Sequence, residues 1–341
     1  MIDAQSNRDS FCLAHVALML ALGILCSMPL AAEPVHSAIT LSACGSSIEA
    51  RFREGTASIP RQDLIEWINA AAHAVCTYYG RFPVPHLTLD VHGGSRPGIH
   101  HGVTYARDGG FITISVGPET TREQLLDDWM LTHEMIHLAF PSMTEAHHWI
   151  EEGISTYVEP VARVQAGELS AGEMWRQFVR DMPQGEPKAG DRGLDHTPTW
   201  GRIYWGGAMF CLVADVRIRE RTGTRKGLQD ALREILREGG GITQNWTIDR
   251  ALSVGDQFTG TTVLEELYRE MRSQPSPVDL PGLWNKLGLR TMENGALQLD
   301  NLAPLSHVRE AITRPANSKV TLEAMPRELR PWMPRTPVQR K

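Results

Sequence analysis

Two histidines four residues apart, His133 and His137, restrict the fold of this chain more than any other feature of its sequence. The segment reads His-Glu-Met-Ile-His, and on a helix the side chains of residues i and i+4 lie one above the other on the same face. Two imidazole nitrogens placed in this way can bind one metal ion at about 2.0–2.1 Å. Glu134 then lies where a carboxylate can accept a proton from a metal-bound water. The motif therefore predicts a helix with a metal site on one face.

The sequence around the motif favours this helix. Thr121 and Gln124 form the pattern of a capping box, and we expect the helix that begins there to continue until Pro141. A loop of about seven residues can then reverse the chain into an antiparallel helix, expected over residues 148–164 and rich in acidic side chains. The alternative is a solvated helix whose histidines have no common role.

The remaining patterns predict an α+β fold with two lobes. Residues 33–120 form a mixed lobe, with a helix over 60–79, a strand over 86–91, and a hairpin of strands 103–106 and 111–116 around an Asp-Gly-Gly turn. Residues 121–313 form a helical lobe, with further helices expected over 203–221, 227–238, 261–273 and 280–286 and a long loop over 181–200. Residues 314–341 are rich in Pro and Arg and are expected to form an extended tail.

The N-terminus has the layout of a secretory signal. Residues 11–25 are apolar, which is too short a run to cross a bilayer, and the small residues Ala31 and Ala32 follow. We expect residues 1–32 to be removed and the mature protein to be periplasmic or secreted, with no stable membrane span. An uncleaved anchor and a buried helix are the alternatives.

Three cysteines remain after such a cleavage, in a compartment that is expected to be oxidising. Cys211 lies within an apolar helical segment and is expected to be a buried free thiol. A Cys44–Cys76 disulfide stays open, because the sequence does not give the separation of their Cα atoms.

The charge of the chain argues against one class of partner. Lys and Arg number 34 and Asp and Glu 40, so the formal net charge is −6. A chain without a basic surplus cannot neutralise many phosphates, and we expect no nucleic-acid partner.

The second helix carries a specific resemblance. Residues 149–159 read WIEEGISTYVE, which resembles the W-L-N-E-G-x-x-x-Y-x-E segment of the gluzincin metallopeptidases, such as aminopeptidase N and the glycyl aminopeptidases. The resemblance implies a zincin-like catalytic domain and one Zn²⁺ ion, with His133, His137 and Glu152 as its ligands. Glu151 stands where the family has Asn and is the second choice; both carboxylates could instead be surface groups.

A second segment, residues 202–208, reads RIYWGGA and resembles the family's Y-x-K-G segment, which opens a long apolar helix. The resemblance implies that Tyr204 stabilises the oxyanion of the reaction, although Gly206 replaces the family's Lys. The alternative is a tyrosine that only caps a core helix.

Two departures from the family leave the choice between endopeptidase and exopeptidase open. The loop between His137 and Glu152 is shorter than in aminopeptidase N, and the G-A-M-E-N segment that binds a free N-terminus is missing upstream. The strand over 110–117 is expected to pair with an extended peptide by edge addition instead. Several other residues are weaker candidates: His147 and His148 as rival ligands or donors, Thr156 as a partner of a ligand histidine, and His100, His101 and His196 as substrate contacts.

These features together predict an exported zinc-dependent peptidase that hydrolyses peptide bonds through a zinc-bound water, with Glu134 as general base and Tyr204 as oxyanion donor. The substrate would be a peptide or a protein. One alternative is a non-catalytic protein of the cell envelope that keeps the zinc fold for binding or as a scaffold, which would have no use for Glu134. A weaker alternative is a cytoplasmic enzyme with an accidentally apolar N-terminus.

Overall fold

A five-stranded sheet forms the first part of the computed structural model, which describes residues 35–56, 58–292 and 295–315. The predicted signal segment and the tail beyond Pro315 lie outside the described residues. The strand order is β1-β2-β3-β5-β4. Strands β2, β3 and β5 run parallel, while β1 and β4 are antiparallel to their neighbours. The strands are β1 (Val35–Ala43), β2 (Ser46–Arg53), β3 (His86–Gly93), β4 (Ile99–Tyr105) and β5 (Phe111–Val116).

This order corrects one prediction. Strand β5 is the segment expected to pair with a peptide, but it is hydrogen-bonded to β3 on one side and to β4 on the other. The hairpin of β4 and β5 is confirmed, and it places β4 at the edge. The free edge of the sheet next to the helices therefore belongs to β4.

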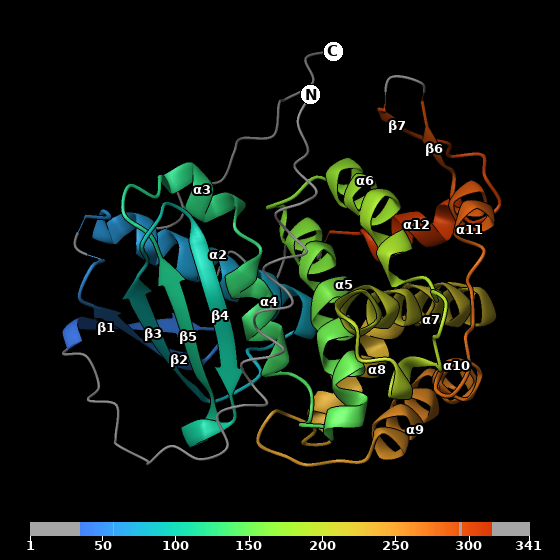
Figure 1. Ribbon diagram of the computed structural model, residues 1–341, viewed down its shortest axis with the longest axis horizontal. Coiled ribbons are helices and arrows are strands. Elements are labelled where there is room, and N and C mark those ends of the chain that lie inside the picture. The colour runs from blue at the N-terminus through green and yellow to red at the C-terminus, as the bar shows by residue number, and fades with distance from the viewer. Residues whose placement is uncertain (1–34, 57, 293–294, 316–341) are drawn as a thin grey trace. The chain divides into compact units, whose positions relative to one another are not determined.

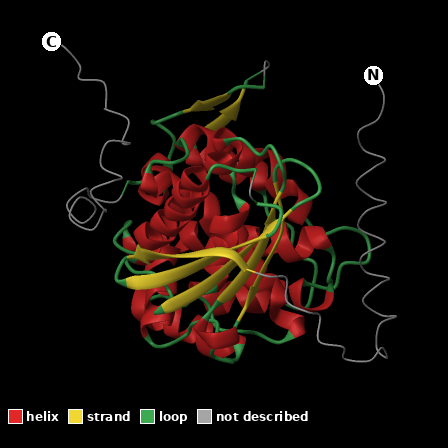
Figure 2. Ribbon diagram, turned by 90° about the vertical axis from the view of Figure 1, so that its left-hand side faces the viewer, coloured by secondary structure: helices red, strands yellow, loops and turns green. Residues whose placement is uncertain are grey.

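Helices cover one face of the sheet, and they lie behind the strands in Figure 2 and to their right in Figure 1. Helix α5 is central, because it packs against α2, α4 and α7. The predicted α+β class, with a mixed strand lobe and a helical lobe, is confirmed, whereas the exact domain boundaries stay a prediction. The helices are α2 (Arg61–Tyr79), α3 (Arg122–Asp127), α4 (Met130–His137), α5 (His148–Ala166), α6 (Ala171–Asp181), α7 (Gly207–Thr222), α8 (Leu228–Arg237), α9 (Ile248–Thr259), α10 (Val263–Met271), α11 (Leu280–Leu287) and α12 (Ser306–Ile312).

Short elements complete the described chain. The hairpin of β6 (Leu289–Thr291) and β7 (Leu297–Leu299) follows α11. The helical turns are η1 (Arg107–Gly109), η2 (Glu145–His147), η3 (Met182–Gly185), η4 (Leu194–His196) and η5 (Arg202–Gly206). Within the described residues, no helix is long and apolar enough to cross a bilayer.

Helix α2 forms where the sequence predicts it and connects the parallel strands β2 and β3. Its apolar residues Leu64, Ile68 and Val75 recur at helical spacing and are buried. The helix ends at Gly80, whose φ of 76° is the left-handed conformation that glycine adopts without steric cost. Helix α2 packs against α4 and α5, so it supports the two helices that carry the predicted site.

The helix predicted from residue 121 to Pro141 is broken in two, so this prediction is wrong in part. The capping box of Thr121 and Gln124 is confirmed at the start of α3. At Asp128 the backbone is extended, and the carboxylate accepts hydrogen bonds from the backbone N–H groups of Met130 and Leu131, each at 3.0 Å. The side chain thus caps a new helix, because it satisfies donors that a helix start leaves free. Helix α4, which carries the His-Glu-Met-Ile-His motif, therefore has its own N-terminal cap.

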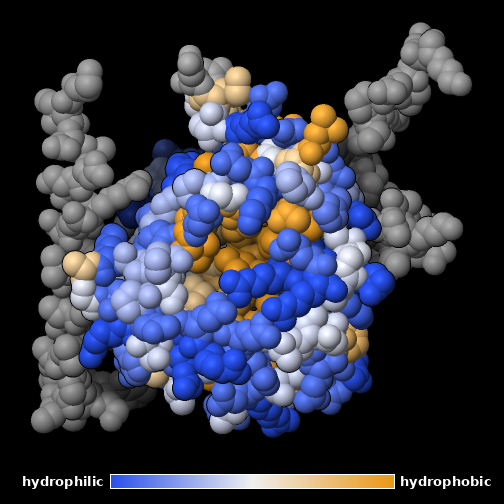
Figure 3. Space-filling model, turned by 90° about the vertical axis from the view of Figure 1, so that its right-hand side faces the viewer, coloured by the Kyte–Doolittle hydropathy of each residue, from blue (hydrophilic) through white to orange (hydrophobic). Residues whose placement is uncertain are grey.

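The face of the helical lobe that lies away from the sheet has a hydrophobic patch and a cavity. The face at the right of Figure 1 gathers hydrophobic side chains in its middle and hydrophilic ones around them (Figure 3). A cavity of about 170 Å³ lies where α7 meets α10 and the chain that follows it. Its lining residues are Val213, Arg217, Leu267, Glu270, Met271, Ser276, Pro277, Val278 and Asp279, so it includes none of the predicted site residues.

The structure closes the open question about the cysteines. Cys44 lies in the two-residue turn between β1 and β2, and it forms a disulfide with Cys76 of α2, with the Cα atoms 6.4 Å apart. Cys211 is a buried free thiol, as predicted. The disulfide ties the first hairpin of the sheet to the helix that covers it.

We expect loss of this disulfide to destabilise the protein. The bridge closes a loop with a sequence separation of 32 residues, and chain-entropy arguments assign about 3–4 kcal/mol to a loop of that size. The double substitution Cys44→Ser, Cys76→Ser should lower the free energy of unfolding in urea by that order. Oxidised and reduced wild-type protein are the matched comparison, and equal urea midpoints for these two forms would show that the bridge contributes nothing.

Candidate metal and catalytic site

Helices α4 and α5 bring together the three residues predicted as metal ligands. The Nε2 atom of His133 lies 3.1 Å from the Oε2 atom of Glu152, and the Nε2 atom of His137 lies 3.6 Å from it. One donor atom from each residue lies within 4.8 Å of the other two. A tetrahedral ion with bonds of about 2.0–2.1 Å separates its ligand atoms by roughly 3.3 Å. The spacing of the three groups therefore fits one such ion, and the two-nitrogen, one-oxygen donor set suits zinc.

The charges in this cluster favour a cation. Burial alone would raise the pKa of Glu152, but hydrogen bonds from His133 and His137 outweigh it and hold the pKa well below its usual range. Burial alone would lower the pKa of His137, but Glu152 and the nearby charges of Glu134 and Glu151 raise it to about 9. The cluster thus concentrates negative charge and attracts a positive charge to the imidazoles.

Glu151, the second choice as a ligand, points elsewhere. Its Oε1 atom accepts a hydrogen bond from the backbone N–H of Met143 at 3.2 Å, and its Oε2 atom lies 3.4 Å from Nδ1 of His148. It therefore stabilises the loop before α5. Glu151 and Glu152 are consecutive, so their side chains leave α5 in different directions. Of the two, only Glu152 lies in the cluster with His133 and His137.

The other candidate histidines lie around the cluster or away from it. His148 is beside it, with Nε2 at 3.3 Å from the Oε1 atom of Glu152. His147 instead contacts Tyr268. His196 is exposed on η4. The Nε2 atom of His100 lies 3.0 Å from the backbone oxygen of Pro97.

Thr156 does not orient a ligand histidine as expected. Its hydroxyl is buried and has no hydrogen-bond partner among the described residues. The hydroxyl that does reach the site is that of Thr104 on the edge strand β4.

Strand β4 holds Glu134 in place, which the sequence analysis missed. The Oγ1 atom of Thr104 lies 2.6 Å from the Oε2 atom of Glu134 and 2.9 Å from its backbone oxygen, so the hydroxyl donates to one or the other. A Cβ atom on Gly102 would lie 2.8 Å from Cγ of Glu134, so only glycine leaves room for the carboxylate. Residues 102 and 104 share a face of the strand, and a glycine within a strand is a sequence signal of such a close approach.

Tyr204 lies next to the cluster. It belongs to η5, a π-helical turn before α7. Its ring stacks on that of His133, with centroids 6.3 Å apart and planes at 20°. Burial raises the pKa of Tyr204, and the charges of Glu152 and Glu134 raise it further. The phenol therefore keeps its proton at neutral pH and can act as a donor. The predicted start of a regular helix at 203 is corrected to this turn.

A contact between two glycines sets the position of this segment. A Cβ atom on Gly153 would overlap the backbone of Gly207, and a Cβ atom on Gly207 would overlap the backbone oxygen of Trp149. The backbones of helices α5 and α7 are therefore in contact. On α5 the contact is next to Glu152, and on α7 it lies three residues after Tyr204. This contact fixes the oxyanion-donor candidate relative to the ligand candidate.

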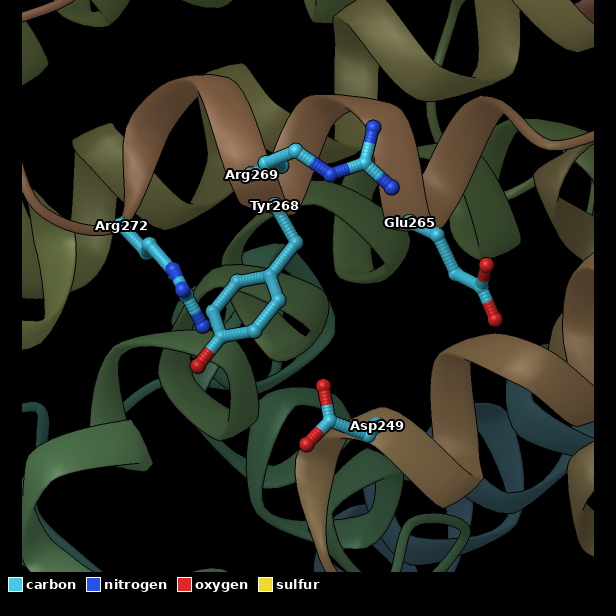
Figure 4. A pocket seen from close by; sticks show the side chains of 5 residues that line it. All are labelled: Asp249, Glu265, Tyr268, Arg269 and Arg272. Atoms are coloured by element: carbon cyan, nitrogen blue, oxygen red, sulfur yellow. The ribbon is translucent and has the colours of Figure 1, made fainter.

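A partly buried network of hydrogen bonds holds the N-terminal end of α5. Asp195 accepts a hydrogen bond from the indole of Trp149 and another from the hydroxyl of Tyr268, both at 2.9 Å. The Tyr268 hydroxyl also lies 3.1 Å from Nε2 of His147. The ring of Tyr268 borders a separate cavity of about 300 Å³ between α9 and α10, where charged side chains surround it (Figure 4). Its lining residues are Asp249, Glu265, Tyr268, Arg269 and Arg272, and none of them belongs to the metal cluster.

Comparison with known proteins supports the fold. No family model matches the chain, and no curated protein matches it either. The crystal structure of an aminopeptidase N family protein from Idiomarina loihiensis superposes with a TM-score of 0.56 at 13% sequence identity, over 79% of this chain and 53% of that one. At this identity the likeness establishes the fold alone, and the predicted resemblance to gluzincin metallopeptidases is confirmed at that level.

Two further structures are similar to smaller extents. The M1 zinc metallopeptidase from Deinococcus radiodurans has a TM-score of 0.46 at 12% identity, over 72% of this chain and 52% of that one. A mutant of the M1 enzyme from the same organism, bound to the substrate Tyr-Ser-Ala, has a TM-score of 0.45 at 14% identity, over 72% and 54%. The chain thus spans about half the length of the solved structures it resembles.

The two neighbouring carboxylates of α5 allow a matched test of metal binding. We expect Glu152→Gln to lose most of its bound zinc, because an amide lacks the charge of the carboxylate between the two imidazoles. Glu151→Gln, one residue away and outside the cluster, should retain about one zinc per chain. Metal content after dialysis measures both, and equal zinc in the two variants would contradict the assignment of Glu152.

Proposed function

We propose that this chain is a zinc-dependent peptidase that is exported from the cytoplasm. The observation that carries the proposal is the convergence of three donor atoms, from His133, His137 and Glu152, with the carboxylate of Glu134 beside them and the phenol of Tyr204 above. A protein that used the fold only for binding would need the three ligands but would have no role for Glu134.

Each residue would have a defined task in peptide hydrolysis. The bound zinc would supply a Lewis acid that lowers the pKa of a water from 15.7 towards about 7 and polarises the scissile carbonyl. Glu134 would take the proton from the attacking water and pass it to the leaving amine. Tyr204 would donate its phenolic proton in a hydrogen bond to the oxyanion that develops on the substrate.

The substrate would approach along the edge of the sheet. Strand β4 is an edge strand, and its residues Gly102 and Thr104 contact Glu134 directly. An extended peptide that pairs with the unpaired backbone groups of such an edge carries its scissile bond past the adjacent general base. This supports a peptide or protein substrate.

Export is supported by two independent features. The apolar run at residues 11–25 has the length of a signal segment rather than of a membrane span. The Cys44–Cys76 disulfide is typical of a protein that folds in an oxidising compartment. The proposed location is the periplasm or the extracellular space, and N-terminal sequencing of the mature protein from cell fractions tests it.

We expect Glu134→Gln to abolish peptide hydrolysis while the protein keeps its zinc. The amide has nearly the shape of the carboxylate but cannot accept the proton of the attacking water. Cleavage of a mixed peptide library by zinc-loaded protein, with and without a chelator, is the measurement. Retention of full activity by this variant would exclude Glu134 as the base, and bound zinc without cleavage by the wild type would favour the scaffold alternative.

Tyr204→Phe is expected to slow turnover by a factor of about 10² to 10³, because one donor to an oxyanion contributes roughly 3 kcal/mol to transition-state stabilisation. Zinc content and thermal stability should stay close to those of the wild type. The loss should appear in kcat, since the hydrogen bond forms as the oxyanion develops. An unchanged kcat would show that Tyr204 is not an oxyanion donor and only packs on His133.

A further inference from the structure

The two half-exposed tryptophans of the described chain both lie at the proposed reaction centre. Trp129 is 49% exposed and Trp200 is 51% exposed. Five others are at most 8% exposed: Trp67, Trp149, Trp175, Trp246 and Trp284. An indole left half in water is a large apolar surface that the fold has not used. Its place beside the site gives it a candidate use.

Each exposed indole contacts one of the site's own rings. Trp129 meets the ring of His133 edge to face, with centroids 5.5 Å apart and planes at 87°. Trp200 stacks on Tyr204, with centroids 5.7 Å apart and planes at 27°. In both pairs the tryptophan stands four residues before its partner, so a helical turn aligns the two side chains on one face.

The four rings form a continuous row. His133 and Tyr204 stack on each other, and each is also in ring contact with one tryptophan, so the contacts run in the order Trp129, His133, Tyr204, Trp200. The two inner rings belong to the proposed ligand and to the proposed oxyanion donor. The scissile bond of a bound peptide would lie at these inner rings, and the side chains before and after that bond would then meet the outer rings.

We propose that Trp129 and Trp200 determine specificity, and that the preferred substrates carry aromatic side chains on both sides of the cleaved bond. This inference rests on the proposed peptidase function and adds a substrate class to it. Aromatic side chains gain from stacking on an indole beyond the area they bury, by about two- to tenfold in affinity per pair. An alanine at the same position would leave the indole in water.

The backbone at both tryptophans is fixed by contacts that do not depend on a substrate. The backbone oxygen of Trp129 accepts the hydrogen bond from the backbone N–H of His133. Trp200 precedes η5, whose Arg202 pairs with the buried carboxylate of Asp191 at 2.8 Å. The backbone that carries both indoles is therefore fixed before a substrate binds, which limits the ordering that binding requires.

Cleavage of a short peptide series tests the proposal. The substrates are Ala-Ala-Phe-Phe-Ala-Ala, the two peptides with a single central Phe, and the hexapeptide of alanine. Zinc-loaded wild type should cleave the Phe-Phe peptide at its central bond with a kcat/KM at least about tenfold above that for the alanine peptide. Trp129→Ala should remove the preference for Phe on one side of the bond, and Trp200→Ala the preference on the other.

The controls separate specificity from structure. Trp129→Phe and Trp200→Phe should restore most of the preference, and zinc content should be unchanged in all four variants. Phe258→Ala removes an aromatic residue of similar exposure, 40%, which lies on α9 under Lys226. This variant should retain the wild-type ratio between the Phe-Phe and alanine peptides. If the tryptophan variants lower kcat/KM for all peptides equally and leave that ratio unchanged, the proposal is overturned.

A binding measurement distinguishes this failure from that of the proposed function. Calorimetric titration of the Phe-Phe and alanine peptides into Glu134→Gln protein without zinc reports on the aromatic row alone. Tighter binding of the Phe-Phe peptide that is lost in the tryptophan variants supports the row even if no peptide is cleaved, and peptidase function then fails by itself. Equal binding of the two peptides, or cleavage without aromatic preference, overturns the row.

Discussion

The buried carboxylate of Glu152 between two imidazoles is the interaction on which the rest of the site depends. An ionised group in such a place costs several kcal/mol unless opposite charge compensates it. Here the compensation comes from His133 and His137, and the low pKa of Glu152 and the raised pKa of His137 are two sides of one interaction. A bound dication would take the place of the shared proton. The fold thus holds its ligand candidates in a state that already favours a cation.

This arrangement requires helices that approach unusually closely. Gly153 and Gly207 leave no space for a Cβ atom between α5 and α7, so the two backbones are in contact. The same crossing presents Glu152 to the histidines of α4 and brings the turn with Tyr204 over them. A glycine pair in the interior of a helix crossing weakens helix propensity by about 1 kcal/mol per residue, and the gain is a fixed distance between two functional side chains.

Much of this could be predicted because it depends on local signals. The i,i+4 spacing of the histidines, the capping box at Thr121 and the stop at Gly80 each act within one or two turns of chain, and the structure has all three. The break at Asp128 was not predicted, since a helical pattern of apolar residues continues through it. The Asp-Gly-Gly turn indicated the pairing of β4 with β5, but the parallel pairing of β5 with β3 was out of reach, because no local signal joins strands that are not consecutive in the chain.

The residues that complete the site are those whose partners are distant in sequence. Thr104 reaches Glu134 across 30 positions, and Asp195 reaches Trp149 across 46. The segment at 181–200, expected to be a long loop, is fixed by such contacts, with Asp195 bonded to Trp149 and Tyr268 and Asp191 paired with Arg202. Buried polar contacts of this kind immobilise irregular backbone without any periodic pattern. A site built partly on loops can therefore be as rigid as one built on helices, and its supporting residues become visible only in three dimensions.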